Sequence, residues 1–273
     1  MKKIGILFLG LISAFNFSQN TRFVYQVSMK TDSTAVPKIE NAYLDISTEK
    51  SIFYGEKRMK RDSTIRQAME TRNFNFDRNS MEQFRTAITY SIEKNHATKT
   101  ITYKDRIARD QYWYDEDRTF NWKILPETVK IGEYETQKAE TTFAGRKWFA
   151  WFTQDLPFID GPYKFSGLPG LIVKVEDEKG DYSFDLKETK KIAELPNFES
   201  RFGNNIKVKR SEFLKQQEKF NKDPMSFFQN QGGGFAMRMG GNQNPQNEAE
   251  RRKMMEERLK EEAKANNNPL EKN

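Results

Sequence analysis

The sequence predicts a mainly β protein, built on a curved antiparallel sheet that forms an open half-barrel, with peripheral helices and a C-terminal helix. Three observations lead to this prediction. Short segments alternate apolar and polar residues with a period of two, their connections are short and polar, and helical composition is found mainly near the C-terminus. The 273 residues are 36% hydrophobic and 13% aromatic, which is enough for a large core and argues against a disordered chain.

The first residues have the plan of a secretory signal peptide. Met1–Lys3 is basic, residues 4–15 form an almost unbroken apolar run, and residues 16–20 turn polar. The run is shorter than the roughly 20 residues needed to cross a bilayer, and no later segment is long enough. We therefore expect residues 1–19 to be a signal peptide and the protein to be exported, periplasmic or secreted, without a transmembrane segment. Because the sequence contains no cysteine, we do not expect a lipoprotein.

Alternation with a period of two marks the strands that follow. The apolar residues that share one face of the first strand are Phe23, Tyr25, Val27 and Met29. The same pattern is repeated by Ala42, Leu44 and Ile46. Further short β-rich runs are Ile52–Tyr54, Thr86–Ile92, Thr100–Tyr103, Gln111–Tyr114 and Phe120–Ile124. Their short polar connections favour antiparallel neighbours over crossover helices.

The clearest hairpin spans Leu171–Lys187. Both of its arms present apolar residues to one face and polar residues to the other, which is typical of an antiparallel sheet with one buried face. The turn between the arms is Asp177–Asp181, where Gly180 can adopt a positive φ.

Residues 20–224 are expected to form one β-rich domain with a helix near its end, at Ser211–Lys222, capped by Ser211. Residues 225–247 are rich in Gly, Asn and Met and predict a flexible loop, because they cannot bury enough apolar area to offset the entropy of ordering. Residues 248–273 predict a charged helix and a tail, since opposite charges recur four residues apart in the helical part.

The segment that contains two tryptophans predicts a strand with two apolar faces. The faces are formed by Trp148, Ala150 and Phe152 on one side and by Phe149 and Trp151 on the other. Each buried aromatic side chain contributes on the order of 2–3 kcal/mol, so neither face is expected to be open to water. Another layer of protein, a helix or a ligand would each provide the second cover.

The segment Asp155–Ile172 contains three prolines and three glycines in eighteen residues. This composition excludes a regular helix or an interior strand and predicts a loop of one fixed shape. The apolar residues of the loop indicate that it packs inward.

The end of this loop reads Gly167-Leu168-Pro169-Gly170-Leu171-Ile172, and here the chain resembles the GLPGLI family of exported bacterial proteins, whose function is uncharacterised. The resemblance extends to Gly161–Phe165, the Trp148/Trp151 strand and Thr136–Ala139. It also includes Asn267–Glu271, which is similar to the usual ending of the family. The resemblance implies an exported β-rich domain and supplies no catalytic residue.

Two sets of candidate site residues follow. The candidate ligand contacts are Trp148, Phe149, Trp151, Tyr163 and Phe165, with the motif loop Gly167–Ile172 beside them. Asp155 and Asp160 flank Pro157 and are the candidates for carboxylate catalysis, with turn formation as the alternative role. His96 lies in a polar turn and is interpreted as a solvated residue, which leaves no serine-hydrolase triad.

Composition excludes several classes of site. With one histidine and no cysteine, the sequence offers no multi-histidine metal centre, no thiolate site and no disulfide, and it predicts no cofactor. The formal net charge of +7 is spread over 46 basic and 39 acidic residues, so nucleic acid is not an expected partner. The basic run Lys57–Arg61 is interpreted as a solvated connection.

These patterns predict a non-enzymatic, exported β-domain that binds an apolar ligand or a component of the cell envelope. A hydrolase that uses Asp155 and Asp160 on envelope or external polymers is the alternative. In a third interpretation the charged C-terminal helix does the binding. The identity of the ligand and the oligomeric state stay open.

Overall fold

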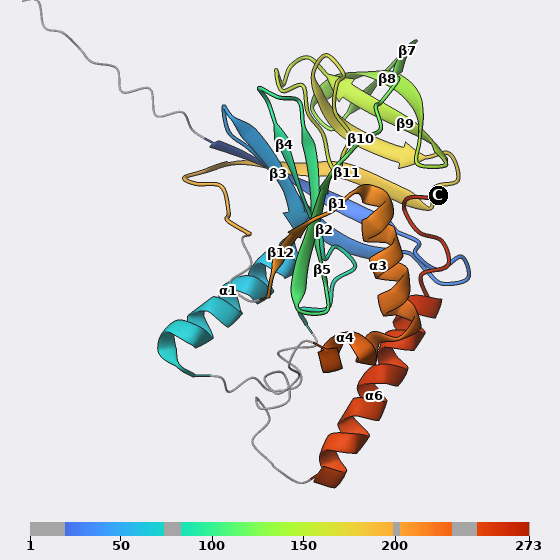
Figure 1. Cartoon of the computed structure of the whole chain (residues 1–273). Helices are drawn as coiled ribbons and strands as arrows, with labels where there is room; N and C mark the ends of the chain where they lie inside the picture. The colour runs from blue at the N-terminus through green and yellow to red at the C-terminus, as the bar shows by residue number, and fades with distance from the viewer. Residues whose placement is uncertain (1–19, 74–82, 199–202, 231–244, 273) are drawn as a thin grey trace, which may run out of the picture.

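A computed structural model describes residues 20–73, 83–198, 203–230 and 245–272 (Figure 1). The predicted signal peptide lies outside these residues. The strands are β1 (Asn20–Met29), β2 (Lys38–Ile46), β3 (Lys50–Gly55), β4 (Ser91–Asn95), β5 (Ile101–Ile107), β6 (Asp110–Asp115), β7 (Lys123–Ile131), β8 (Tyr134–Phe143), β9 (Arg146–Thr153), β10 (Leu171–Asp177), β11 (Tyr182–Ile192) and β12 (Asn205–Lys207). The helices are α1 (Glu56–Thr71), α3 (Arg210–Lys222), α4 (Pro224–Asn230) and α6 (Pro245–Lys264).

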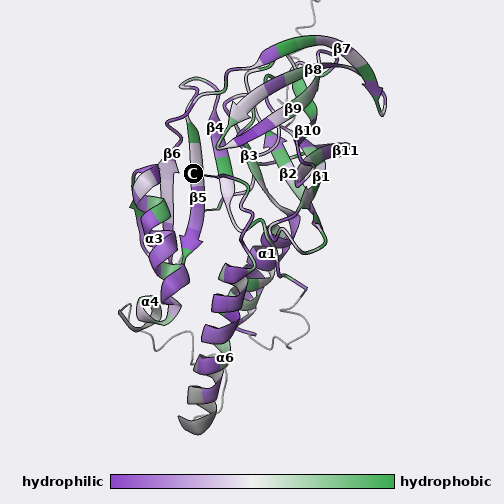
Figure 2. Cartoon of the chain, turned by 90° about the vertical axis from the view of Figure 1, so that its right-hand side faces the viewer, coloured by the Kyte–Doolittle hydropathy of each residue, from purple (hydrophilic) through white to green (hydrophobic). Residues whose placement is uncertain are grey.

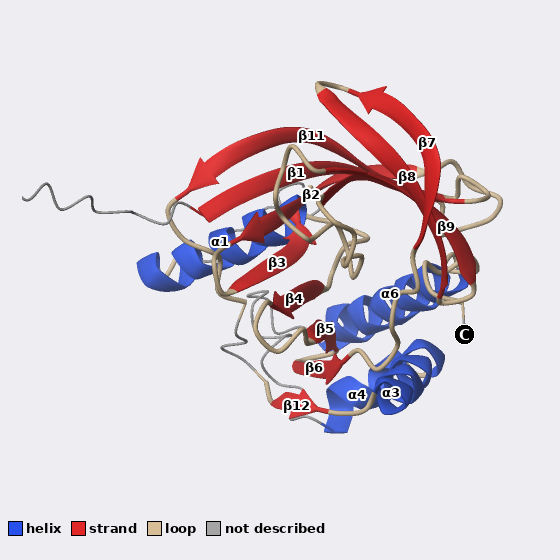
Figure 3. Cartoon of the chain, turned by 90° about the horizontal axis from the view of Figure 1, so that it is seen from above, coloured by secondary structure: helices blue, strands red, loops and turns tan. Residues whose placement is uncertain are grey.

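The twelve strands form one sheet in the order β12-β6-β5-β4-β3-β2-β1-β11-β10-β9-β8-β7. Neighbouring strands are antiparallel except for the short β12, which pairs with β6 in parallel. Seen from above, the strands follow an arc that does not close (Figure 3). The predicted mainly β class and the open, curved antiparallel sheet are therefore confirmed.

The core lies on one face of the sheet, where aromatic side chains from distant strands meet the loop between β9 and β10. Phe53 of β3 packs against Phe184 of β11, with ring centroids 6.1 Å apart. From the loop, Phe165 packs against Trp148 at 4.8 Å and against Phe184 at 6.2 Å. The loop thus supplies the layer that seals this face, as its apolar residues indicate.

The helices lie at the periphery. Helix α3 packs against β5 and β6, and α6 packs against α3 and α4. The hydropathy colouring shows α6 as mostly hydrophilic (Figure 2). Within the described part of the chain, no helix combines the length and the apolar character that spanning a bilayer requires.

The interpretation of Lys57–Arg61 as a solvated connection is wrong, because these residues belong to α1. Arg58 is only 5% exposed and stacks over the Phe198 ring, with 4.7 Å from Cζ to the ring centroid. Lys60 and Glu56 form an ion pair of 2.8 Å one turn apart on the outside of the helix. The sequence pattern does not predict α1, because this helix has no apolar stripe. Its inner face carries the side chain of Arg58 instead.

Three smaller expectations also need correction. Residues 86–90 are not strand, because the Glu40 carboxylate accepts the backbone N–H of Ala87 at 2.9 Å in place of a neighbouring strand. Ser211 is not a cap: α3 begins at Arg210, after Lys209, without a side-chain capping bond. The predicted loop 225–247 is helical at both ends, in α4 and in the first turn of α6, and its residues 231–244 lie outside the described part.

Candidate functional site

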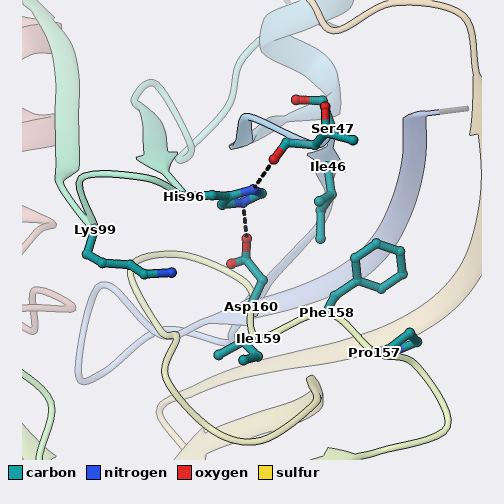
Figure 4. Close-up of a pocket in the computed structure, with 9 residues that line it drawn as sticks. Ile46, Ser47, His96, Lys99, Pro157, Phe158, Ile159 and Asp160 are labelled. Atoms are coloured by element: carbon teal, nitrogen blue, oxygen red, sulfur yellow. Dashed lines mark hydrogen bonds and ion pairs between the residues drawn. The ribbon is translucent and has the colours of Figure 1, made fainter. Parts of the chain in front are cut away.

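An open cavity of about 300 Å³ lies where three turns meet (Figure 4). One side is formed by the β2–β3 turn, one by the β4–β5 turn, and the third by the start of the loop between β9 and β10. The lining residues are Ile46, Ser47, Thr48, His96, Lys99, Pro157, Phe158, Ile159 and Asp160. We call this cavity the turn pocket.

The β4–β5 turn fixes the cationic side of the turn pocket. The Asn95 side chain accepts the backbone N–H groups of Ala97 and Thr98 at 3.0 and 2.9 Å, which closes the turn. Lys99 then takes a left-handed backbone with φ of 58°. Its exposed side chain points toward the pocket (Figure 4) and has no salt bridge or hydrogen bond within the described residues.

The opposite side is apolar and partly open. Ile159 is 66% exposed, although it is a large hydrophobic residue. Phe158 is half-buried because its ring packs edge-on against Phe23 of β1, with centroids 5.3 Å apart. The turn pocket therefore pairs an apolar wall with a cationic rim.

A buried ion pair forms the floor. Lys94 of β4 donates to the Asp160 carboxylate, to Gly161 O at 2.6 Å and to Phe165 O at 3.1 Å. Gly161 N donates to the same carboxylate at 2.7 Å. Burial alone would raise the pKa of Asp160, but the Lys94 charge and the hydrogen bonds outweigh burial and lower it.

His96 lies between this floor and the β2–β3 turn. Its Nδ1 is 3.2 Å from Thr48 O, and its Nε2 is 3.8 Å from an Asp160 oxygen (Figure 4). Both neighbours only accept hydrogen bonds, so the arrangement favours the imidazolium form. The bond to Asp160 is the main cause that raises the pKa of His96 above its ordinary value. His96 lies in a turn as predicted and its side chain is 34% exposed, but its ring contacts Thr48 O and Asp160, which the interpretation as a solvated residue did not include.

A second buried ionic cluster holds the far end of the same loop. Lys164 Nζ is 2.6 Å from Glu116 Oε2, 2.6 Å from Glu271 Oε1 and 3.0 Å from the Tyr114 hydroxyl. Arg118 donates to both carboxylates at 2.7 to 2.8 Å. This cluster joins the loop to β6 and to the last described residues of the chain.

The structure brings three of the predicted ligand contacts together, but in the core. Trp148, Tyr163 and Phe165 are at most 3% exposed, and the rings of Tyr163 and Phe165 lie 5.9 Å apart. None of the three lines the turn pocket. Their role as ligand contacts stays a prediction.

The other two predicted contacts lie on the opposite face of β9. Phe149 and Trp151 are half-buried there, and neither a helix nor a second sheet covers them within the described part. Lysine ammonium groups lie over the rings instead: Lys138 at 4.5 Å from the Phe149 centroid, and Lys174 at 5.1 Å from that of Trp151. The second apolar face is thus covered by lysine side chains.

The two candidate catalytic aspartates differ in environment. Asp155 is exposed, whereas Asp160 is 3% exposed and engaged by Lys94 and Gly161. A catalytic acid needs a pKa raised toward neutral pH, and that of Asp160 is lowered. The geometry does not favour the hydrolase. Among the described residues, no group of three or more His, Asp and Glu side chains is arranged to hold a metal ion.

The motif loop has a structural basis in this geometry. Gly170 has φ of 145°, and a Cβ placed there would lie 2.0 Å from Thr153 O. Leu168 is buried, and Ile172 O accepts the Tyr25 hydroxyl at 2.6 Å. The motif therefore closes the loop against the ends of β9 and β10.

Sequence reasoning missed the residues that matter most in the two ionic clusters, Lys94 and Lys164. Lys164 carries a detectable signal, because a lysine between Tyr163 and Phe165 is out of place in an inward-packed apolar loop. Lys94 and Lys99 carry none, since both belong to a segment that reads as a polar turn.

One comparison with known proteins matches the part of the chain that contains this loop. A protein-family model described as "Protein of unknown function (Porph_ging)" matches residues 141–174, which run from the end of β8 through β9 and the loop into β10. No curated protein matches the sequence.

Among solved structures, the chain is similar to PNGF-II in two crystal forms. The TM-scores are 0.52 and 0.53, the identities 17% and 16%, and the matches cover 72% of this chain but only 33% and 32% of PNGF-II. A LolA superfamily protein from Nitrosomonas europaea matches with a TM-score of 0.28 and 9% identity, over 66% of this chain and 88% of its own. At these identities the PNGF-II match indicates a shared fold, and the family match indicates similarity of residues 141–174 to a family of unknown function.

Proposed function

We propose that this protein is an exported, non-catalytic β-domain, and that the turn pocket binds a small ligand with an apolar body and an acidic group. The observation that carries the proposal is that one cavity is lined by Ile159, which is 66% exposed, and by Lys99, whose ammonium has no ion pair or hydrogen bond with the described residues. A soluble protein gains nothing in stability from either feature alone.

The size of the turn pocket limits the ligand. A volume of about 300 Å³ is at the lower end of the range for small-molecule sites. It fits a compact molecule or the end of a longer chain, such as the head and first carbons of an amphiphile. An apolar wall formed by Pro157, Phe158 and Ile159 would contact the carbon chain.

The charge of the turn pocket sets the polarity of the ligand. The negative charge of Asp160 is already balanced by Lys94 on the floor. Lys99 leaves a positive rim, to which His96 adds a second charge when it is protonated, and this favours a carboxylate, sulfate or phosphate group. Export follows from the predicted signal peptide at residues 1–19, and an apolar ligand or envelope component fits that location.

Binding of decanoate tests the proposal. We expect decanoate to displace the fluorescent anionic probe 8-anilinonaphthalene-1-sulfonate from the folded protein, whereas decyltrimethylammonium, with the opposite charge, should displace it poorly. Ile159→Asp and Lys99→Asn should each weaken decanoate binding at least ten-fold. Asn is chosen at position 99 because it tolerates the left-handed backbone.

Val36→Asp is the matched control. Val36 is 85% exposed and lies away from the turn pocket, so the same change of charge there should leave binding unchanged. Equal binding by Ile159→Asp and the wild type would rule out the turn pocket as the site. Equal displacement by the two amphiphiles would rule out a role for the cationic rim.

A further inference from the structure

The segment Asn267–Lys272 follows α6, and we call it the tail segment. Its backbone and side chains form hydrogen bonds with distant parts of the chain. Asn268 N donates to Thr31 O, and Lys272 N donates to Ala144 O, both at 2.8 Å. The Asn268 side chain donates to Lys30 O at 2.7 Å. Backbone and side chain of the tail segment are therefore both recognised, as in a bound peptide.

Arg146 of β9 donates hydrogen bonds to the middle of the tail segment. It donates to Leu270 O at 3.0 Å, to Pro269 O at 2.7 Å and to the Asn268 side chain at 2.6 Å. Its Nη1 donates to Asp177 at 2.7 Å and to Asp181 at 3.3 Å, which holds the guanidinium in place. The buried arginine thus presents fixed donors to three consecutive residues of a peptide.

Glu271 enters the second ionic cluster. Its carboxylate accepts from Lys164 at 2.6 Å, from the Tyr163 hydroxyl at 2.5 Å and from Arg118 at 2.7 Å. Without Glu271, the charges of Lys164 and Arg118 would be balanced by Glu116 alone. The site therefore requires a carboxylate three residues after the asparagine.

We propose that the site that holds the tail segment is a recognition site for an acidic peptide of the form Asn-Pro-apolar-Glu. The tail segment of a second copy of the chain can occupy it. Nothing in the contacts depends on the connection to α6, since every donor and acceptor faces residues 267–272 themselves. Within one chain the tail segment competes at an effective concentration on the order of millimolar, so exchange needs high protein concentration or a weakened tail.

A labelled synthetic peptide of residues 264–273 tests the recognition. We expect the full chain with Glu271→Gln to bind it at least ten-fold more tightly than the wild-type chain, whose own tail segment competes. The same peptide with Gln in place of Glu271 should bind at least ten-fold more weakly. The control chain Glu261→Gln, changed at an exposed position of α6, should behave as the wild type.

Mixing two variants tests the exchange. A chain with Glu271→Gln keeps the binding site for the tail segment, and a chain with Lys164→Met, first shown by circular dichroism to be folded, keeps the tail segment itself, so a heterodimer should form only in the mixture. Failure of the peptide to bind, or equal binding of its Gln form, would overturn the recognition site. Peptide binding without a heterodimer at millimolar concentration would overturn the exchange. The peptide assay does not involve the turn pocket, so its failure leaves the proposed ligand site unaffected.

Discussion

Lys164 Nζ lies 2.6 Å from Glu271 Oε1, although 107 residues separate the two along the chain. The lysine side chain has no exposed surface, and Glu116 contacts the same ammonium. The loop between β9 and β10 and the tail segment are therefore fixed to each other by one buried charge. The contact holds the part of the loop around Lys164 in place.

Replacing Lys164 by methionine should destabilise the protein strongly. Methionine keeps the length of the stem but removes the buried ammonium, which leaves Arg118 between Glu116 and Glu271 and the more distant Arg210 at 4.0 Å from Glu271. Breaking a buried ion pair from one side costs about 3–5 kcal/mol. Urea unfolding followed by circular dichroism measures this loss.

The control for this variant is Lys123→Met, which removes an ion pair with Glu140 at a lysine whose side chain is 73% exposed. There we expect a loss of at most about 1 kcal/mol. Equal losses in the free energy of unfolding at the two positions would mean that burial does not increase the contribution of the Lys164 cluster to stability.

Acid should weaken the fold through the same cluster. Burial would raise the pKa of Glu116, but the hydrogen bonds from Arg118 and the charge of Lys164 lower it to about 2. A carboxyl with a lowered folded pKa stabilises the protein above its unfolded value of 4.5, and this contribution is lost as pH falls toward 2. The free energy of unfolding should therefore decline below pH 4.5.

Glu116→Gln should be less stable at pH 7 and should lose less stability between pH 4.5 and pH 2 than the wild type does. The comparison variant is Glu261→Gln, on the exposed side of α6, which should keep the wild-type pH profile. Parallel profiles for the wild type and Glu116→Gln would contradict the assignment.

The protonation of His96 is directly observable, because it is the only histidine of the sequence. The bond to Asp160 raises its pKa, so its contribution to stability is present below 6.5 and is lost as pH rises through the folded value. A titration followed by NMR should show one imidazole with a pKa above 6.5. Asp160→Asn should lower that pKa, whereas Glu49→Gln, in the adjacent turn, should not.

The sequence was sufficient to predict the sheet but not the residues of the candidate site. Phe23, Tyr25 and Val27 alternate, and all are buried, because a strand with one dry face leaves a period of two in the sequence. The Leu171–Lys187 hairpin was predictable for the same reason and pairs as expected, with Val175 opposite Phe184.

The site was not predictable because charge pairing across long separations has no local period. Lys94 and Asp160 are 66 residues apart, and nothing near Lys94 indicates that its ammonium is buried. Helix α1 was missed for a related reason, since Arg58 takes the place of an apolar residue on its inner face. Such positions are defined only when the whole fold brings their partners together.

The two glycines of the motif loop should differ in their tolerance of alanine. Gly167 and Gly170 both have positive φ, at 93° and 145°, so alanine is strained at either position. At Gly167 the new methyl group would meet no atom within 4 Å, and we expect a loss of about 1–2 kcal/mol. At Gly170 it would lie 2.0 Å from Thr153 O and 2.7 Å from its carbonyl carbon, both backbone atoms that cannot turn aside.

The end of β9 would then have to move away from the loop, and we expect Gly170→Ala to cost at least about 3 kcal/mol. Thermal unfolding of both variants measures the difference, and decanoate binding shows whether the displaced loop also disturbs the turn pocket. If Gly170→Ala is no less stable than Gly167→Ala, the close approach to Thr153 O is not what requires a glycine at position 170. A lower melting temperature with unchanged decanoate affinity would show that the end of the loop can move without the segment Pro157–Asp160.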